Sequence, residues 1–232
     1  MTPADLIQQA RAAKRTALDE SAGKRLLAAY RVNVPRSVVV AGPGEVEAAF
    51  RTLKAPVVVK VVSPDILHKS DAGGVKVNLR SAAEVREAIE AMAAAPQIRS
   101  ARIDGYLIEE MAPAGQEIVV GGLRDPQFGP LVMVGLGGIF VEVLADVSFR
   151  ICPITRLDAQ EMLAELKGAA ILKGARGRKP VDTEAIIDVL LKVGGEDGLL
   201  MRHADDVKEA DINPLIVSDT GAVAVDARFI LT

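Results

Sequence analysis

The end of the chain carries two alternating apolar runs joined by a short polar turn, and this feature constrains the fold most. The runs are Ala210–Val217 and Ala222–Ile230, and the residues Ser-Asp-Thr-Gly stand between them. This composition is typical of the turn of a β-hairpin. Pairing Ser218 with Gly221 at the turn fixes the register of every other pair, so the sequence predicts which residues of the two strands face each other.

In this register the hairpin gathers polar side chains on one face. Asn213 faces Asp226, and Asp211 faces Arg228. The opposite face is expected to be core and carries Ile212, Ile216, Val225, Ala227 and Phe229. Cross-strand Cβ atoms lie about 4.5 to 5.5 Å apart, so Asn213 and Asp226 would reach one hard cation such as Mg²⁺. A solvated face with one surface ion pair is the alternative, and Pro214 is able to introduce a bulge that shifts the register.

Composition excludes several functions. Of 232 residues, 28 are Lys or Arg and 31 are Asp or Glu, so the net charge is −3. Without a basic excess, and with only 3 % aromatic residues, nucleic acid is not expected as a partner. The longest uncharged run, residues 126–141, is broken by glycine and proline and is too short for a membrane span. A single cysteine and an N-terminus without a continuous apolar stretch predict a cytoplasmic protein.

Helical and strand-like patterns are mixed along the chain, which predicts an α+β fold. We expect Tyr106–Met111 and Glu117–Gly122 to pair across the turn Ala-Pro-Ala-Gly, and a hinge near residues 99–105 to join a smaller front half to a larger back half. The other expected elements are two helices within Pro3–Tyr30, strands at Val32–Val40, Ala55–Val62 and Leu131–Val134, and helices at Ser81–Ala95, Thr155–Leu172 and Asp182–Val193.

The segment VVVKVVSPDILHKSDAGGV contains three kinds of candidate residue. Lys60 lies within the most apolar strand, where an ammonium group is costly unless it reaches an anion or snorkels to water. Phosphate oxygens would supply that anion. Gly73 and Gly74 permit backbone N–H groups to approach phosphates, although a Gly-Gly pair is more often only a turn. His68 lies in an expected loop, where an imidazole is able to titrate, bind metal or act as a nucleophile, although most loop histidines do none of these.

A second candidate cluster comprises Glu109, Glu110 and Met111, followed by Glu117. An adenine would hydrogen-bond to the backbone of such a strand and a ribose to Glu117, whereas the bland alternative is a set of solvated carboxylates. The glycines of residues 135–138 lack the third glycine and the crossover helix of a dinucleotide fingerprint, and the chain contains no GxxxxGK[ST] motif. A Rossmann site and a P-loop are therefore excluded.

Five segments in order resemble the ATP-grasp nucleotide-binding (beta) subunit of ADP-forming acyl-CoA synthetases, the acetate–CoA ligase group related to succinyl-CoA synthetase. They are ESAGKRLLAAYRVNVP, the segment around Lys60 and His68, LIEEMAPAGQEIVVGGLRDPQFGPLVMVGLGGIFVEVLADV, ILKGARGRKPVD, and ADINPLIV with VDARFIL. The resemblance covers nearly the whole chain. It implies an ATP-grasp fold over residues 1–232, with two α+β subdomains enclosing a nucleotide cleft. The smaller subdomain is expected at about residues 22–104, and the larger at 1–21 and 105–232.

The resemblance also implies a role for each candidate residue. Lys60 would contact the phosphates of ATP or ADP, and Gly73 and Gly74 would belong to a phosphate-covering loop. Asn213 and Asp226 would be the Mg²⁺ ligands. Glu109, Glu110 and Met111 would line the adenine, and Glu117 would lie near the ribose. His68 matches the histidine that accepts a phosphoryl group from the partner subunit and passes it to ADP.

The implied reaction is acyl-CoA + ADP + phosphate ⇌ carboxylate + CoA + ATP. Because the chain has no CoA-binding domain of its own, the resemblance implies a CoA-binding alpha subunit, with an α₂β₂ complex expected. Two alternatives stay open. One is a non-catalytic ATP-sensing module like those attached to some protein acyltransferases, and the other is a stand-alone carboxylate–amine ligase.

Overall fold

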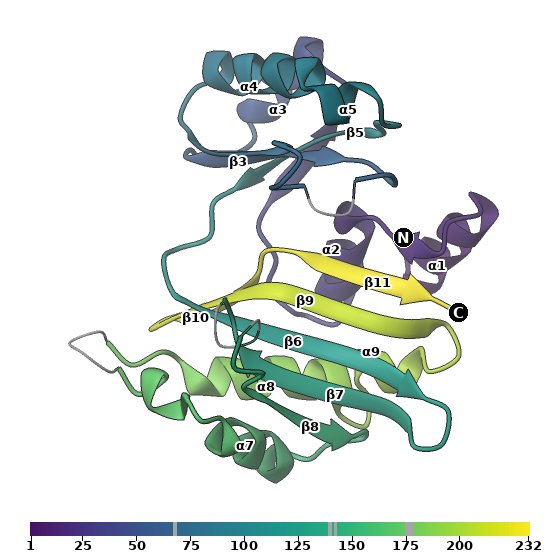
Figure 1. The fold of residues 1–232 in the computed structure, drawn as a ribbon, viewed down its shortest axis with the longest axis vertical. Coiled ribbons are helices and arrows are strands. Elements are labelled where there is room, and N and C mark those ends of the chain that lie inside the picture. Colours follow the sequence, from purple (N-terminus) through teal and green to yellow (C-terminus); the bar gives the residue numbers. More distant parts are fainter. Residues whose placement is uncertain (67–68, 139–140, 142, 175–178) are drawn as a thin grey trace. The chain divides into compact units, whose positions relative to one another are not determined.

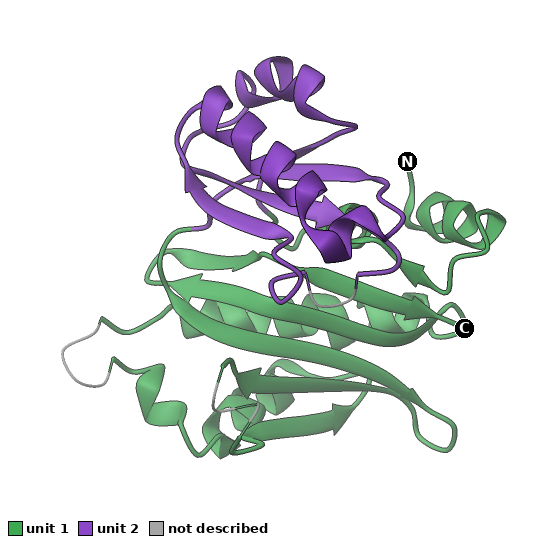
Figure 2. Cartoon of the chain, turned by 45° about the horizontal axis from the view of Figure 1, so that its top comes forward, with its two compact units in different colours: residues 1–34, 113–232 green, residues 35–112 purple. Residues whose placement is uncertain are grey.

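The chain folds into two compact units, each with its own sheet and hydrophobic core. The computed structural model describes residues 1–66, 69–138, 141, 143–174 and 179–232. The larger unit comprises Met1–Val34 and Pro113–Thr232, and the smaller unit comprises Pro35–Ala112 (Figure 2). Helices and strands are mixed in both units, which confirms the α+β class. Among the described residues, no helix combines the length and apolarity needed to cross a bilayer.

The boundaries of the smaller unit differ from the expected residues 22 and 104. Helix α2 (Glu20–Ala29) buries Leu26 and Leu27 in the core of the larger unit, so the smaller unit starts only at Pro35. Strand β5 (Gly105–Glu110) pairs with β2 (Ser37–Val40) and β3 (Val57–Val62) of the smaller sheet. The smaller unit therefore continues to Ala112.

The larger unit is built on an antiparallel sheet in the order β1-β11-β9-β6-β7-β8, with β10 also beside β9. Helices α7, α8 and α9 pack on strands of this sheet (Figure 1). The strands are β1 (Ala17–Leu18), β6 (Gln116–Asp125), β7 (Gly129–Leu136), β8 (Val147–Ile151), β9 (Val207–Ser218), β10 (Gly221–Ala224) and β11 (Ala227–Leu231). The helices are α1 (Pro3–Ala12), α2, α7 (Arg156–Glu165), the 3₁₀ turn η2 (Ala169–Ile171), α8 (Thr183–Gly194) and α9 (Leu199–Arg202).

Strand pairing confirms the predicted register of the terminal hairpin both next to its turn and at its far end. Gly221 pairs with Ser218 next to the turn, and Arg228 pairs with Asp211 farther along. The regular ladder is interrupted between these two stretches, because β10 ends at Ala224 and β11 begins at Ala227.

The expected core face is wrong near this interruption. Ile212, Leu215 and Val217 are fully buried, whereas Ile216 and Val225 are half-buried. A register shift between β6 and β9 lies at the same place, whereas the hairpin register, which a bulge at Pro214 would have shifted, is unchanged. Strand β9 therefore changes the parity of its buried residues at Asn213–Pro214.

The smaller unit has a four-stranded antiparallel sheet in the order β2-β5-β3-β4. Its helices α3 and α4 pack on the sheet (Figure 1). Ser81 caps α4 by accepting the N–H of Glu84 at 3.2 Å, as predicted, while the Glu84 carboxylate accepts the N–H of Arg80 at 2.7 Å. The elements are β2 (Ser37–Val40), η1 (Pro43–Glu45), α3 (Val46–Phe50), β3 (Val57–Val62), β4 (Val75–Leu79), α4 (Ala82–Ala94), α5 (Pro96–Arg99) and β5.

Two predictions about neighbouring elements are wrong. The strands β5 and β6 do not form a hairpin, since β5 belongs to the smaller sheet and β6 to the larger one. The helix expected over Thr155–Leu172 ends at Glu165, because Leu166 is in an extended conformation (φ −62°, ψ 129°). Strand β8, which closes one edge of the larger sheet, had no sequence prediction.

Candidate functional site

In the smaller unit, Lys60 is held by a buried carboxylate. Its Nζ lies 3.1 Å from Oε1 of Glu109, and the two side chains are 8 % and 0 % exposed. The register explains the pair: Val58 of β3 stands opposite Glu109 of β5, so Lys60 is its diagonal neighbour, within reach of a long side chain. Alternation places Val57, Val59 and Val61 in the helix-covered core and Lys60 on the other face. Lys60 is thus neither snorkelling nor solvated, and Glu109 is not a solvated carboxylate.

Gly73 and Gly74 form a tight turn at the end of the loop after β3. Gly73 has φ of +72°, a conformation that favours glycine. Its N–H donates to Ser70 O at 3.1 Å, and that of Gly74 donates to Lys69 O at 2.7 Å. A Cβ on Gly74 would lie 2.5 Å from Val61 Cγ1. Glycine is therefore required here by the turn itself. His68 lies outside the described residues.

The strand that ends at Glu110, just before Met111, is not an exposed edge. β5 lies between β2 and β3, so the expectation of an open backbone at Glu109 and Glu110 is wrong. The Glu110 carboxylate accepts the N–H of Lys54 at 2.9 Å. The Met111 Sδ lies 3.3 Å from the N–H of Asn78. Both side chains thus have contacts within the smaller unit.

In the larger unit, Asn213 and Asp226 lie opposite each other where the hairpin ladder is interrupted. The N–H of Asn213 donates to Asp226 O at 3.2 Å, and the N–H of Val225 donates to Pro214 O at 2.9 Å. The Asp226 Oδ1 also accepts the N–H of Ala227 at 2.8 Å. The predicted cross-strand pair is therefore present, in irregular backbone between regular strands.

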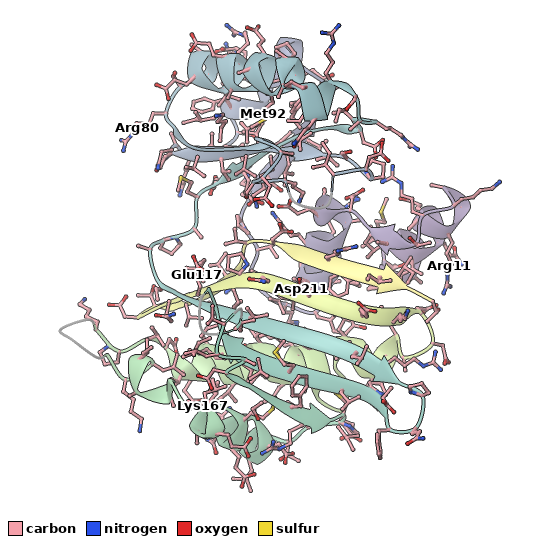
Figure 3. All side chains as sticks on the ribbon, in the orientation of Figure 1. Arg11, Arg80, Met92, Glu117, Lys167 and Asp211 are labelled. Carbon is pink, nitrogen blue, oxygen red and sulfur yellow. The ribbon has the colours of Figure 1, made fainter. Side chains whose placement is uncertain are left out.

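Asp211 adds a second carboxylate beside Asp226. Partial removal from water, together with the charge of Asp226, raises the pKa of Asp211, while Arg228 lowers it. Asp211 and Arg228 also line a hollow of about 380 Å³ on the larger sheet, with Met133, Phe149 and Ile230 among its apolar walls. Glu117, on the adjacent strand β6 (Figure 3), is exposed. These polar residues therefore lie on strands β6, β9 and β11 and, for Asp226, in the irregular backbone just before β11.

Two oxygen donors of this set suit Mg²⁺, which prefers carboxylate and amide oxygens and keeps waters or phosphates as its other ligands. The described residues contain no group of three or more His, Cys, Asp or Glu side chains arranged for a metal ion. Asn213 and Asp226 are therefore suited to a metal ion whose remaining ligands are nucleotide oxygens or waters, rather than to one coordinated by the protein alone.

Comparison with known proteins decides the family. An ATP-grasp domain model matches residues 9–231. The beta subunit of ADP-forming acetate–CoA ligase I from Pyrococcus furiosus is 46 % identical over 229 residues, which cover 98 % of this chain and 97 % of that one. This chain belongs to the ATP-grasp family. Within it, the chain is a member of the beta subunits of ADP-forming acyl-CoA synthetases, as the resemblance implied.

Solved structures agree with this membership. An acetyl-CoA synthetase from Ca. Korarchaeum cryptofilum, in complex with coenzyme A and Ca-AMPCP, superimposes with a TM-score of 0.92 at 43 % identity. The match covers 98 % of this chain and 99 % of that chain. In the ADP-forming acetate–CoA ligase I of Archaeoglobus fulgidus, 44 % identical, the matching region is 30 % of a longer protein.

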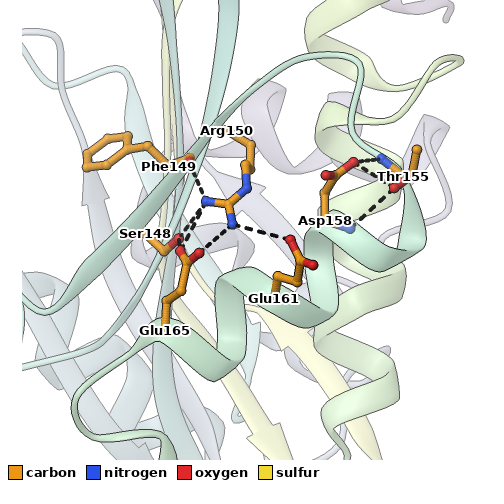
Figure 4. Close-up of polar contacts among 7 residues, drawn as sticks. All are labelled: Ser148, Phe149, Arg150, Thr155, Asp158, Glu161 and Glu165. Carbon is orange, nitrogen blue, oxygen red and sulfur yellow. Dashed lines mark hydrogen bonds and ion pairs between the residues drawn. The ribbon is translucent and has the colours of Figure 1, made fainter.

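One further polar cluster in this ATP-grasp chain involves none of the predicted site residues. Arg150 of β8 contacts Glu161 and Glu165 of α7, and Glu165 also accepts a hydrogen bond from Ser148 (Figure 4). These contacts lower the pKa of Glu165 to about 2, with the hydrogen bond from Arg150 as the largest cause. The cluster ties a helix to an edge strand and has a structural role.

Sequence reasoning missed two features near the site. The pairing of Lys60 with Glu109 required the register of β3 and β5, which no turn fixes. The second is a buried ion pair between Glu20 and Lys24 in α2, whose Nζ and Oε1 atoms are 2.7 Å apart. Its signal was present as oppositely charged residues four apart within the apolar stripe of an amphipathic helix.

Proposed function

We propose that this chain binds Mg·ADP or Mg·ATP and catalyses the nucleotide half of the reaction acyl-CoA + ADP + phosphate ⇌ carboxylate + CoA + ATP. The observation that carries the proposal is the opposition of Asn213 and Asp226 at the break in the hairpin ladder. The backbone hydrogen bond between these two residues, and the influence of Asp226 on the pKa of Asp211, support an amide and two carboxylates sharing this region.

In this proposal the metal belongs to the larger unit. Asn213 and Asp226 would hold Mg²⁺, which supplies charge neutralisation and orientation of the phosphates when bound. Two carboxylates near each other disfavour their own ionised forms, and a divalent cation removes that repulsion. Exposed Glu117 is the candidate for the ribose hydroxyls, because an ionised carboxylate accepts hydrogen bonds.

The smaller unit would bind the phosphates and the adenine. Lys60 is the candidate phosphate ligand, and its ion pair with Glu109 orients its ammonium group. Gly73 and Gly74 belong to the proposed phosphate-covering loop. Glu110 and Met111 are the candidates beside the adenine. Glu110 would act indirectly, by accepting the backbone N–H of Lys54 and so holding that backbone in place.

His68 is the proposed relay. Its neutral imidazole nitrogen would attack a phosphoryl group carried by the partner, so that one N–P bond forms as the partner's phosphoryl bond breaks. The β-phosphate oxygen of ADP then takes the group, which frees His68 and yields ATP. Splitting one transfer into two shorter steps is the use of a covalent intermediate.

A CoA-binding alpha subunit, in an α₂β₂ cytoplasmic complex, is the proposed partner. Support comes from relatives named subunit beta and from the longer Archaeoglobus protein, of which the matching region is 30 %. Co-expression with a CoA-binding chain should give a complex active in ATP formation. Full ligase activity from this chain alone would contradict the proposed division of labour.

The test of the relay compares the two histidines of the chain, His68 and His203. His203 packs edge-on against Tyr30 and lies 3.5 Å from an Asp206 oxygen, so it serves as the control. After incubation with ATP and Mg²⁺, an acid-labile phosphate is expected on His68 only. His68→Asn should abolish ATP formation by the complex while leaving Mg·ADP binding nearly intact.

Two outcomes would contradict this proposal. Undiminished ATP formation by His68→Asn would overturn the relay role. Binding of ATP without any phosphorylated histidine would instead indicate a non-catalytic ATP-sensing module.

A further inference from the structure

Helix α2 buries two charged residues that the proposed function does not use. Glu20 and Lys24 lie one turn apart and form an ion pair in which each side chain is only 3 % exposed. Leu26 and Leu27 of the same helix are fully buried in the core. Removing two charges from water is costly, and an apolar pair would fill the same space in the core. The pair therefore indicates a requirement beyond core packing.

The same turn of α2 approaches the backbone of β11 closely. A Cβ on Gly23 would lie 2.6 Å from the carbonyl oxygen of Ala227 and 3.3 Å from Cδ2 of Phe229. Backbone atoms cannot yield as the end of a flexible side chain can, so any side chain at position 23 has to displace the start of β11. Ala227 follows Asp226 directly, and its N–H donates to the Asp226 Oδ1 at 2.8 Å.

The residues before Asp226 are also held from the N-terminal segment. The N–H of Ala224 donates to Asn33 O at 2.8 Å, and the Asn33 side-chain amide donates to Ala222 O at 3.4 Å. On the other side, β9 holds Val225 and Asp226 through Pro214 and Asn213. The break in the ladder is thus fixed from two sides, by β9 and by the segment containing α2 and Asn33.

We propose that α2 is the positioning element for Asp226: Gly23 sets the distance to Ala227, whose N–H holds the Asp226 carboxylate, and the Glu20–Lys24 pair stabilises the turn of α2 on which Gly23 lies. The inference rests on the proposed function, because it takes Asp226 as a ligand of the Mg²⁺ that accompanies the nucleotide. In this proposal Gly23, Glu20 and Lys24 act through the backbone of β11.

The experiment uses the full chain and measures ADP binding by calorimetry across a Mg²⁺ titration and again in EDTA. Residues that orient a metal ligand typically change metal affinity 10- to 100-fold, so Gly23→Ala and Glu20→Gln should each raise the Mg²⁺ concentration for half-maximal ADP binding by about 10-fold. Binding of ADP in EDTA should stay unchanged. A merely structural role would lower the melting temperature without moving the Mg²⁺ dependence.

Matched controls separate positioning from general damage. Gly44→Ala adds a Cβ where nothing lies within 4 Å. Asp188→Asn breaks another i,i+4 pair of the larger unit, with Lys192 at 2.6 Å, that is exposed at Asp188 (61 %). Neither control should shift the Mg²⁺ titration. Where Gly23→Ala fails to fold, Glu20→Gln decides alone.

The outcomes also separate this inference from the proposed function. If Asp226→Asn shifts the Mg²⁺ titration while Glu20→Gln and Gly23→Ala do not, the positioning role of α2 is overturned and the metal assignment stands. If Asp226→Asn itself has no effect, the metal assignment fails, and the inference fails with it. A shift in all three variants, with unchanged binding in EDTA, supports both.

Discussion

The two units differ in how the charged residues of their candidate sites are paired. The smaller unit buries its candidate cation, Lys60, against a carboxylate, Glu109, that is 0 % exposed. In the larger unit, burial and then the charge of Asp226 raise the pKa of Asp211, while Arg228 lowers it. One unit therefore carries an ammonium paired with a buried carboxylate, and the other carries two neighbouring carboxylates with Arg228 beside them.

This difference indicates whether each unit favours binding of an anion or of a cation. A buried ion pair is already compensated, so an anion that binds Lys60 competes with Glu109 and gains a modest net energy. An acidic pair near the surface is relieved by any divalent cation, so binding there is favoured by the repulsion already present. A metal–phosphate complex offers both charges.

The largest effect is expected at Asp226. Asp226→Asn keeps the size of the side chain but removes the metal-binding charge. Since a metal ion contributes several kcal/mol of charge stabilisation, ATP formation by the complex should fall about 100-fold or more. Steady-state kinetics across Mg²⁺ concentrations measure this, with Asp188→Asn as the control. An unchanged rate would contradict the proposed difference between the two units, because the acidic pair of the larger unit would then bind no metal that the reaction needs.

The second effect concerns the buried pair. Glu109→Leu leaves the Lys60 ammonium without its partner carboxylate, and breaking a buried pair typically costs about 3–5 kcal/mol of unfolding free energy. The double variant Lys60→Met/Glu109→Leu should recover most of this loss but bind ADP more weakly than the unmodified chain. Urea unfolding and calorimetry are the measurements. Equal stability of the Glu109 and double variants would contradict the pairing.

The sequence predicted the terminal hairpin of the larger unit only in part. The hairpin register followed from one turn, since Ser218 opposite Gly221 fixes Asp211 opposite Arg228 at the far end. The break at Asn213–Pro214 changed the burial parity of β9, because a bulge depends on local backbone geometry. Ile216 and Val225 were therefore wrongly predicted as core residues, whereas Leu215 and Val217 are the buried ones.

Pairs of strands that are far apart in the sequence were the features that the sequence could not predict. Glu109 and Lys60 are far apart in sequence, and no turn fixes their strands, so solvated glutamates were as compatible with the sequence as a buried pair. The expected hairpin between β5 and β6 failed for a related reason: a short polar connection is compatible both with a turn and with a crossing from one unit to the other. The resemblance supplied the family, whereas the contacts of Glu110 and Met111 required the structure.

A smaller effect sharpens the description of the acidic pair. Asp211→Asn removes one of two like charges, so the metal-free chain should become slightly more stable to urea at pH 7. Saturating Mg²⁺ and ADP should shrink or reverse this gain, because the cation neutralises the same repulsion. A destabilised metal-free variant would indicate that Arg228, rather than Asp226, dominates the surroundings of Asp211.

The smallest effect is expected at an exposed ion pair, which tests whether burial is what separates the two units. Contacts with Arg150 and Ser148 lower the pKa of Glu165 to about 2 from 4.5, so its contribution to stability is present above about pH 4.5 and is lost as pH falls toward 2. The Glu165 side chain is 50 % exposed, and salt screens such a pair. Unfolding free energies between pH 7 and 3.5 should therefore fall more steeply in the unmodified chain than in Glu165→Gln, and the difference should shrink in 1 M NaCl. Substitution of Glu109 should resist that salt, because no solvent reaches its carboxylate. Equal salt sensitivity at both positions would mean that burial does not distinguish them.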